Sequence, residues 1–276
     1  MAKPKLFDDN IKIEKPKGLK LPITGHGFTR APEEMIKRLE VVSTATASAL
    51  MYMLGIRYTF ITGPRPLKTG QHAVGSALTM QFMPQREDIA SGKVQEEGEN
   101  TSALWAVLDD VQKNDFLMVQ AYGDKHTGCL GEMLVTSFAG RGGVGIVVDG
   151  YIRDWPRIQK MEIPLWTLGA TPNFASQGPL YPWAYAVPIA VGGVLVMPGD
   201  IIIADDDGAV VVPINVAEII LDVAERYEGS EEFSRARLAE GGALRKYYPL
   251  SEEGLAELEE WKLFGLPEQL AKHITL

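Results

Sequence analysis

Two short motifs, Gly-Glu-Met-Leu at residues 131–134 and Arg-Asp at residues 153–154, stand out in this chain, with twenty residues between Glu132 and Arg153. The intervening residues hold a glycine-rich turn and an apolar run. We therefore expect a helix to begin at the first motif and a strand to end just before the second. Connected in this way, the motifs place two carboxylates and one guanidinium within reach of one another.

The segments around these motifs alternate between strand and helix patterns. Apolar runs predict strands at 74–83, 115–120 and 144–148, and helical spacing predicts helices at 101–112, 131–139 and 155–161. Short apolar segments farther along predict strands at 164–166, 186–190, 194–196, 201–204 and 209–212. Strands of such uneven spacing favour an α/β or α+β sandwich over a regular (β/α) repeat.

The two ends of the chain differ from this central part. A Lys- and Pro-rich segment predicts an arm that packs on the domain or on a neighbouring subunit, followed by core helices that start near Pro32 and Ser43. A long amphipathic stretch at 216–244 precedes one or two further helices. We therefore divide the chain into an arm at 1–31, a central domain at 32–243 and a helical tail at 244–276.

Composition narrows the class of protein. A hydrophobic content of 46% and a mean hydropathy of −0.03 are typical of a globular protein with a sizeable core. With 27 basic and 36 acidic residues the net charge is −9, which argues against a nucleic-acid partner. No apolar run reaches the ~18 residues of a membrane span, and the N-terminus lacks a signal pattern. Because Cys129 is also alone, we expect a cytoplasmic protein with no membrane partner.

Three other patterns suggest chemistry but have simpler explanations. Glycines 140, 142 and 145 match Gly-x-Gly-x-x-Gly, yet they follow a predicted helix and precede a strand, the reverse of a dinucleotide site. We interpret them as a turn that needs a positive φ. Asp-Asp-Asp-Gly at 205–208 lies between two apolar strands and predicts a hairpin turn rather than a metal loop. The four histidines lack zinc-ligand spacing, and no His or Asn pattern supports Cys129 as a nucleophile.

The two acids of the motifs each have a structural interpretation beside the functional one. Glu132 falls in the first turn of a helix, where the dipole favours a carboxylate and the amides of Met133 and Leu134 are free to bind an anion. Asp154 could cap the helix that opens at Trp-Pro (155–156). Neither interpretation explains Arg153, a residue type suited to holding a carboxylate bidentately.

The motifs, taken together, resemble those of the RraA-like family. The resemblance spans roughly residues 32–242. That family includes class II pyruvate aldolases acting on 4-hydroxy-4-methyl-2-oxoglutarate and 4-carboxy-4-hydroxy-2-oxoadipate. The resemblance implies a swivelling β/β/α sandwich, assembled as a homotrimer or homohexamer with the site at a subunit boundary. The resemblance rests on these motifs: Gly-Glu-x-Leu, Arg-Asp, Pro164-Leu165, Gly169-Ala-Thr-Pro172, Pro188, Gly192-Gly193, Pro198-Gly199-Asp200, Ala204-Asp205-Asp-Asp-Gly208 and Val211-Val212-Pro213.

Site residues follow from this resemblance by position. It implies that Asp154 ligates Mg²⁺ or Mn²⁺ directly and that Glu132 holds metal-bound water. Arg153 would bind the carboxylate and keto oxygen of the substrate, and the backbone amides of Met133 and Leu134 would complete the substrate site. Arg153 and Glu132 are thus the expected catalytic residues.

Two further points of the resemblance concern charge. A neighbouring subunit's C-terminal helix would add an acid, for which Glu228, Glu231 and Glu232 are the candidates. Aldolase members often carry Glu or Asp three positions after the Asp of Arg-Asp, where this chain has Arg157. The cation at that position alters both the charge around the metal and the preference for substrate.

The implied reaction is a retro-aldol cleavage of a 4-hydroxy-2-oxo acid that releases pyruvate, with oxaloacetate decarboxylation as a companion activity. A hard cation held by few protein ligands suits a bidentate 2-oxo acid. Lys125 is the only lysine near the motifs and lacks apolar neighbours that would activate it for a Schiff base. The alternatives are a protein-binding regulator of RNA processing and a metal-dependent lyase or hydratase acting on a sugar-acid derivative.

Overall fold

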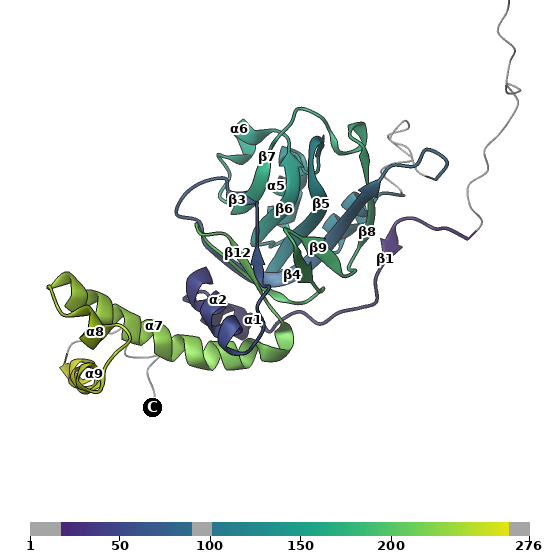
Figure 1. The fold of residues 1–276 in the computed structure, drawn as a ribbon. Helices are drawn as coiled ribbons and strands as arrows, with labels where there is room; N and C mark the ends of the chain where they lie inside the picture. The colour runs from purple at the N-terminus through teal and green to yellow at the C-terminus, as the bar shows by residue number, and fades with distance from the viewer. Residues whose placement is uncertain (1–17, 90–100, 265–276) are drawn as a thin grey trace, which may run out of the picture.

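The computed structural model describes residues 18–89 and 101–264, which form a ten-stranded mixed sheet covered by helices (Figure 1). The central strands run parallel: β4 (Ala73–Pro84), β5 (Asp115–Gly128), β6 (Gly145–Ile152) and β7 (Leu165–Ala170). Antiparallel strands extend the sheet beyond β4: β11 (Ile201–Ala204), β12 (Ala209–Val212) and β2 (Phe60–Ile61). At the opposite edge, β3 (Arg65–Pro66) pairs with β7.

Two additions complete the β structure. Strand β8 (Leu180–Tyr185) pairs antiparallel with the C-terminal part of β4, and the N-terminal arm adds the short strand β1 (Ile23–Thr24) alongside it. Strands β9 (Ile189–Val191) and β10 (Val194–Val196) form a separate hairpin.

The layers follow from the alternation of side chains along the strands. On β5, Phe116 and Met118 pack in one core with the apolar side chains of the β9–β10 hairpin. Leu117 and Val119, which point the other way, belong to a core shared with helices. The hairpin, the large sheet and the helices are thus three successive layers, as expected of a β/β/α sandwich, and the predicted α/β class is confirmed.

Helices cover their face of the sheet in two groups. The first packs on β11 and β12 and contains α1 (Glu33–Leu39), α2 (Thr44–Met53) and α7 (Ala217–Ala239). The second packs on β4 to β6 and contains α4 (Ala103–Asp109), α5 (Glu132–Gly140) and α6 (Trp155–Ile158). Helix α2 begins where predicted because the Ser43 hydroxyl accepts the amide of Thr46 at 3.1 Å.

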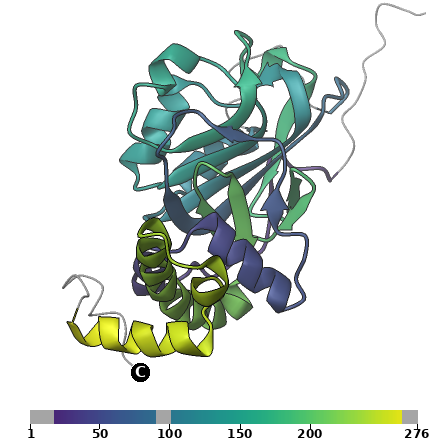
Figure 2. The same cartoon turned by 60° about the vertical axis from the view of Figure 1, so that its left-hand side comes forward.

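The C-terminal helices lie at the end of the molecule opposite α6 (Figures 1 and 2). Helix α7 continues beyond the sheet and packs there with α8 (Leu244–Tyr247) and α9 (Glu252–Phe264) around Phe233, Tyr247 and Leu258. Short 3₁₀ turns η1 (Ala175–Gln177) and η2 (Ile214–Val216) complete the described elements. Within the described ranges, no helix combines the length and apolar character that crossing a bilayer requires.

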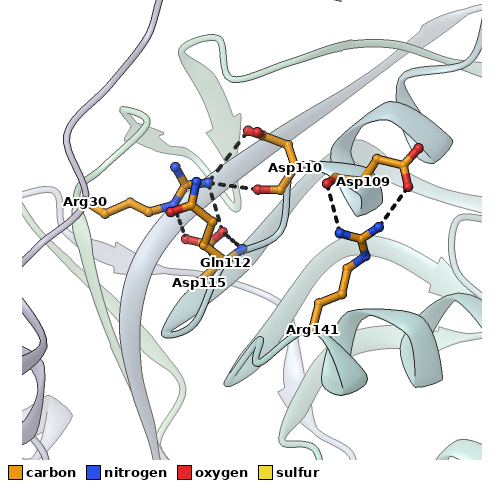
Figure 3. A network of polar contacts seen from close by, with 6 residues as sticks. All are labelled: Arg30, Asp109, Asp110, Gln112, Asp115 and Arg141. Atoms are coloured by element: carbon orange, nitrogen blue, oxygen red, sulfur yellow. Dashed lines mark hydrogen bonds and ion pairs between the residues drawn. The ribbon is translucent and has the colours of Figure 1, made fainter.

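The described part of the N-terminal arm packs on the domain. Farther along the arm than β1, the Arg30 guanidinium binds the Asp115 carboxylate at the start of β5 through Nε at 2.7 Å and Nη2 at 3.0 Å. The carboxylate also accepts the amide of Gln112 at 2.8 Å. Figure 3 shows this cluster next to the more exposed pair of Arg141 and Asp109. Residues 1–17 of the arm and 265–276 of the tail lie outside the described residues.

Both turn predictions are confirmed. Gly142 has a φ of +94° between α5 and β6, which a side chain would disfavour. Asp205 and Gly208 exchange backbone hydrogen bonds at 2.9 and 3.2 Å and close the hairpin between β11 and β12.

Element ends and one strand were predicted wrongly. Helix α6 stops at Ile158 rather than at 161, because the amides of Lys160 and Met161 donate to carbonyls three residues back. Strand β5 runs on to Gly128 through two residues with positive φ, Tyr122 and Gly123. Strand β8 was not predicted, since Pro182 interrupts its apolar run.

Candidate functional site

The two motifs meet at the carboxyl ends of β5 and β6. Because these strands are parallel neighbours, the segments that follow them emerge at the same edge of the sheet. The Cys129 amide donates to the Tyr151 carbonyl, and the Arg153 amide donates to the Leu130 carbonyl, both at 2.9 Å. These bonds hold the start of α5 beside the Arg-Asp motif, so the predicted proximity is confirmed.

Gly131 allows this close approach. A Cβ atom at Gly131 would lie 2.7 Å from Arg153 Nε and 2.8 Å from Asp154 Oδ2, closer than real Cβ contacts. Glycine is therefore favoured here by the space that the Arg153 and Asp154 side chains occupy, not by its φ of −120°.

Asp154 occupies the N-cap position of α6, as the sequence predicted, but its side chain does not serve as a cap. Its φ of +60° places it in the left-handed region, and its side chain makes no capping bond to α6. Instead, Asp154 Oδ2 accepts the amide of Glu132 at 3.3 Å and lies 3.4 Å from Arg153 Nε. The strained backbone, which costs on the order of 1–3 kcal/mol for a non-glycine residue, thus turns the carboxylate toward the N-terminus of α5.

A pocket of about 340 Å³ opens beside this cluster. Arg153 is the only charged residue among those that line it in the described part of the chain. Asp154 and Glu132 are not among the lining residues. Asp154 lies against Gly131, however, and Gly131 does line the pocket. The lining comprises Ser102, Leu104, Trp105, Gly128, Gly131, Met133, Leu134, Arg153, Phe174, Ala175, Ser176, Tyr181 and Pro182.

The amides at the start of α5 differ from the prediction at one position. The Leu134 amide donates to the Gly131 carbonyl at 3.1 Å and is not free to bind an anion. The Met133 amide has no partner among the described residues, and the Glu132 amide donates to Asp154. The anion-binding capacity of this helix start therefore rests on Met133, and Leu134 contributes as a wall of the pocket.

Arg157 contacts Glu132 directly. Its Nη1 atom lies 2.9 Å from Glu132 Oε2, with 26% of the acid side chain exposed and 70% of the arginine. The hydrogen bond that Arg157 donates to this carboxylate, followed by the charge of the carboxylate, raises the pKa of Arg157. The cation that departs from the aldolase pattern is thus paired with the acid expected to hold water.

A divalent cation has one evident direct ligand in this arrangement. No group of three or more His, Cys, Asp or Glu side chains that could hold a metal occurs in residues 18–89 and 101–264. Asp154 is 40% exposed, and its Oδ1 atom accepts no hydrogen bond from the described residues. A single carboxylate oxygen with open space fits Mg²⁺ or Mn²⁺, which keep several waters and bind through one or two carboxylates.

The candidate acids of α7 lie far from this pocket in the same chain. Glu231 and Glu232 precede Phe233, in the part of α7 that packs with α8 and α9; these helices lie at the end of the molecule opposite α6 (Figure 1). A hydrogen bond with Tyr248, then burial, with a smaller effect of Glu231, raises the pKa of Tyr227 to about 12. Glu231 is therefore already engaged, whereas the side chain of Glu228 lies outside the described residues. A role for any of these acids remains a prediction about a neighbouring subunit.

Sequence reasoning missed the aromatic wall of the pocket. Trp105 of α4, Phe174 before η1 and Tyr181 of β8 come from three separate segments, and none belongs to a recognisable motif. The available signal was weak: an aromatic residue in a polar loop and a tryptophan on a short helix. Cys129, in contrast, is fully buried, and burial raises its thiol pKa, as expected of packing rather than nucleophilic chemistry.

These features define an α/β sandwich protein with an arginine-lined pocket at the carboxyl end of its parallel strands. The sequence matches the RraA-like family (Aldolase/RraA) over residues 42–211, more than half of the chain. The chain therefore belongs to the RraA-like family.

Relatives of this chain carry two kinds of name. A protein of Halalkalibacterium halodurans, provisionally named a 4-hydroxy-4-methyl-2-oxoglutarate aldolase, is 29% identical over 66% of this chain and 80% of its own. RraAS2 of Streptomyces coelicolor, described as an unusual member of the RNase ES inhibitor RraA protein family, is 52% identical over 76% of this chain and 99% of its own, with a TM-score of 0.70. A Pseudomonas syringae structure, 22% identical over 80% of this chain and 100% of its own with a TM-score of 0.68, supports the fold alone.

Proposed function

We propose that this protein is a divalent-metal-dependent lyase that cleaves a 4-hydroxy-2-oxo acid and releases pyruvate. The observation that carries the proposal is the Arg153 guanidinium lining a pocket beside the partly free Asp154 carboxylate, with Gly131 leaving room for both. The provisional aldolase name of the Halalkalibacterium halodurans relative supports the same class.

Arg153 binds the substrate carboxylate in this proposal. A guanidinium presents two parallel donors that match a carboxylate, and the Met133 amide offers a further donor at the same helix start. Because the rest of the described lining is uncharged, this contact also fixes which end of the substrate faces the Arg-Asp motif. Substrate orientation of this kind is a large part of catalysis.

Asp154 would hold Mg²⁺ or Mn²⁺. When bound, such a cation supplies Lewis-acid stabilisation of the enolate that forms when the C3–C4 bond breaks. The C4 hydroxyl must lose its proton in the same reaction, and we assign its acceptance to Glu132, whose backbone amide donates to Asp154 at 3.3 Å. The Glu132 carboxylate is paired with Arg157 Nη1 at 2.9 Å.

The test is release of pyruvate, measured with coupled lactate dehydrogenase, from oxaloacetate and from 4-hydroxy-2-oxo acids in the presence of Mg²⁺ or Mn²⁺. We expect turnover that EDTA abolishes and that added metal restores. A protein with Mn²⁺ bound at Asp154 that releases no pyruvate from any of these compounds is not this lyase.

A second candidate function is inhibition of a ribonuclease by protein contact. It is favoured by one observation, the 52% identity with RraAS2 of the RNase ES inhibitor family. A ribonuclease assay with the purified protein tests it. Since protein contact does not need the pocket, Arg153→Ala should leave such inhibition unchanged while it removes lyase activity.

We also propose that the protein works as a homotrimer or homohexamer in which a neighbouring subunit's Glu232 approaches the site. The exposed position of α7 beyond the sheet leaves this helix able to contact another subunit. Sedimentation velocity should give three or six protomers, and a monomer would exclude a shared site.

A further inference from the structure

The pocket joins one charged residue to an apolar wall. Trp105 and Phe174 are 47% and 46% exposed, which is more than is usual for large aromatic side chains. Both line the pocket together with Leu104, Met133 and Pro182. Such half-exposed rings are available to cover an apolar group.

The same pocket offers little to a second negative charge. Among its described lining residues Arg153 is the only cation, and the polar side chains there, Ser102, Ser176 and Tyr181, are neutral. Arg157, the next guanidinium, is paired with Glu132 at 2.9 Å. A second carboxylate pushed against the aromatic wall would lose hydration without gaining a partner.

We propose that this pocket selects 2-oxo acids whose C4 carries an apolar or aromatic group in place of a second carboxylate. The inference rests on the proposed lyase function for the binding of the 2-oxo acid end by Arg153. In the corresponding reaction the C3–C4 bond breaks and the C4 hydroxyl loses its proton to give an aldehyde. The bonding pair forms the enolate, which is protonated at C3 to pyruvate.

Two matched ligands test the inference without catalysis. In 2-oxo-4-phenylbutanoate and 2-oxoglutarate the same 2-oxo acid chain carries at C4 either a phenyl ring or a carboxylate. Neither has a C4 hydroxyl, so neither can be cleaved. Titration calorimetry on the full chain with Mn²⁺ should show that the phenyl compound binds at least about tenfold more tightly, because the ring buries apolar area against Trp105 and Phe174.

Two variants and one control test whether the preference for the phenyl compound comes from the aromatic wall. Trp105→Ala and Phe174→Ala should each reduce the phenyl preference severalfold while the affinity for 2-oxoglutarate stays constant. Tyr58→Ala removes an exposed aromatic ring that does not line the pocket and should change neither affinity. Unfolding curves show whether each variant is folded.

The outcomes separate this inference from the proposed function. Equal or tighter binding of 2-oxoglutarate, no binding of either compound, or an undiminished phenyl preference in both wall variants overturns the inference. Pyruvate release with a preference for 2-oxoglutarate in binding would keep the lyase and reject the apolar specificity. A phenyl preference without pyruvate release from any 4-hydroxy-2-oxo acid would support the specificity and reject the lyase.

Discussion

Two arginine–aspartate pairs in this molecule have the same chemistry and opposite surroundings. Arg30 binds Asp115 through two hydrogen bonds, of 2.7 and 3.0 Å, and Asp115 is fully buried (Figure 3). Arg153 and Asp154 make a single approach of 3.4 Å, and both side chains remain about two-fifths exposed. The first pair uses the binding capacity of its carboxylate completely, whereas the second leaves one oxygen and most of the guanidinium available.

The difference separates a structural contact from a candidate binding site. Burial raises the pKa of Asp115, while the hydrogen bonds of Arg30 and of the Gln112 amide oppose that effect. Burial lowers the pKa of Arg30, but Asp115 outweighs this, so the net shift of Arg30 is upward. The charged form of each partner in this pair is therefore stabilised by the other partner. At Arg153 and Asp154 the unused donors and acceptors remain available for a ligand.

Removal of the buried carboxylate should have the largest effect. Asp115→Asn places an amide against the Arg30 guanidinium and should lower the free energy of unfolding by about 3–5 kcal/mol. Asp109→Asn is the matched control, since Asp109 pairs with Arg141 at 3.1 Å but is 80% exposed, and should cost less than about 1 kcal/mol. Urea denaturation followed by circular dichroism measures both. Equal losses would show that burial does not distinguish the pairs.

Removal of the pocket guanidinium should affect activity and leave stability unchanged. Arg153→Ala should lower kcat/KM by an amount equivalent to at least about 2–3 kcal/mol of transition-state stabilisation, because a charge-assisted contact to the substrate is lost. Its free energy of unfolding should change by less than about 0.5 kcal/mol, as is usual for exposed residues. Arg153→Lys should recover part of the activity, since the charge remains but the bidentate geometry does not. An unchanged kcat/KM in Arg153→Ala would place the site elsewhere.

A methyl group at Gly131 should have an intermediate effect. The atoms that must move are the ends of two flexible side chains, Arg153 and Asp154, so the backbone can stay in place. Gly131→Ala should therefore lower kcat/KM by about tenfold, or ~1.4 kcal/mol, with little loss of stability. Gly140→Ala, in the same helix but with open space around it, should keep full activity. Steady-state kinetics measure both variants. Equal kcat/KM values for Gly131→Ala and Gly140→Ala would contradict the argument from space at Gly131.

The smallest expected effect is at Arg157. Arg157→Gln frees the Glu132 carboxylate and removes one positive charge near Asp154, so Mn²⁺ affinity should rise severalfold. Electron paramagnetic resonance of free Mn²⁺ measures this. Lys160→Gln removes an equal charge from the end of the same segment and should have a weaker effect. Identical affinities in the two variants would mean that the ion pair with Glu132 does not influence the metal.

Local patterns in the sequence predicted much of the fold but less of the site. The strand at 74–83, the Asp-Gly hairpin and the meeting of the two motifs follow from periodicity and turn chemistry, which act over a few residues. The left-handed backbone of Asp154 and the bond between Arg157 and Glu132 depend on how α5 and α6 meet. The aromatic wall unites three distant segments, so no local signal could reveal it.

Gly131, Arg153 and Asp154 touch one another, whereas Trp105 and Phe174 reach the pocket from other segments. A substitution in the first group disturbs all three members at once. The two aromatic residues lie on segments of their own, so each can be exchanged singly. For the proposed lyase, substrate range could therefore diverge by point mutation while the reaction is conserved, and a library confined to positions 105 and 174 is the natural starting point for redirecting it.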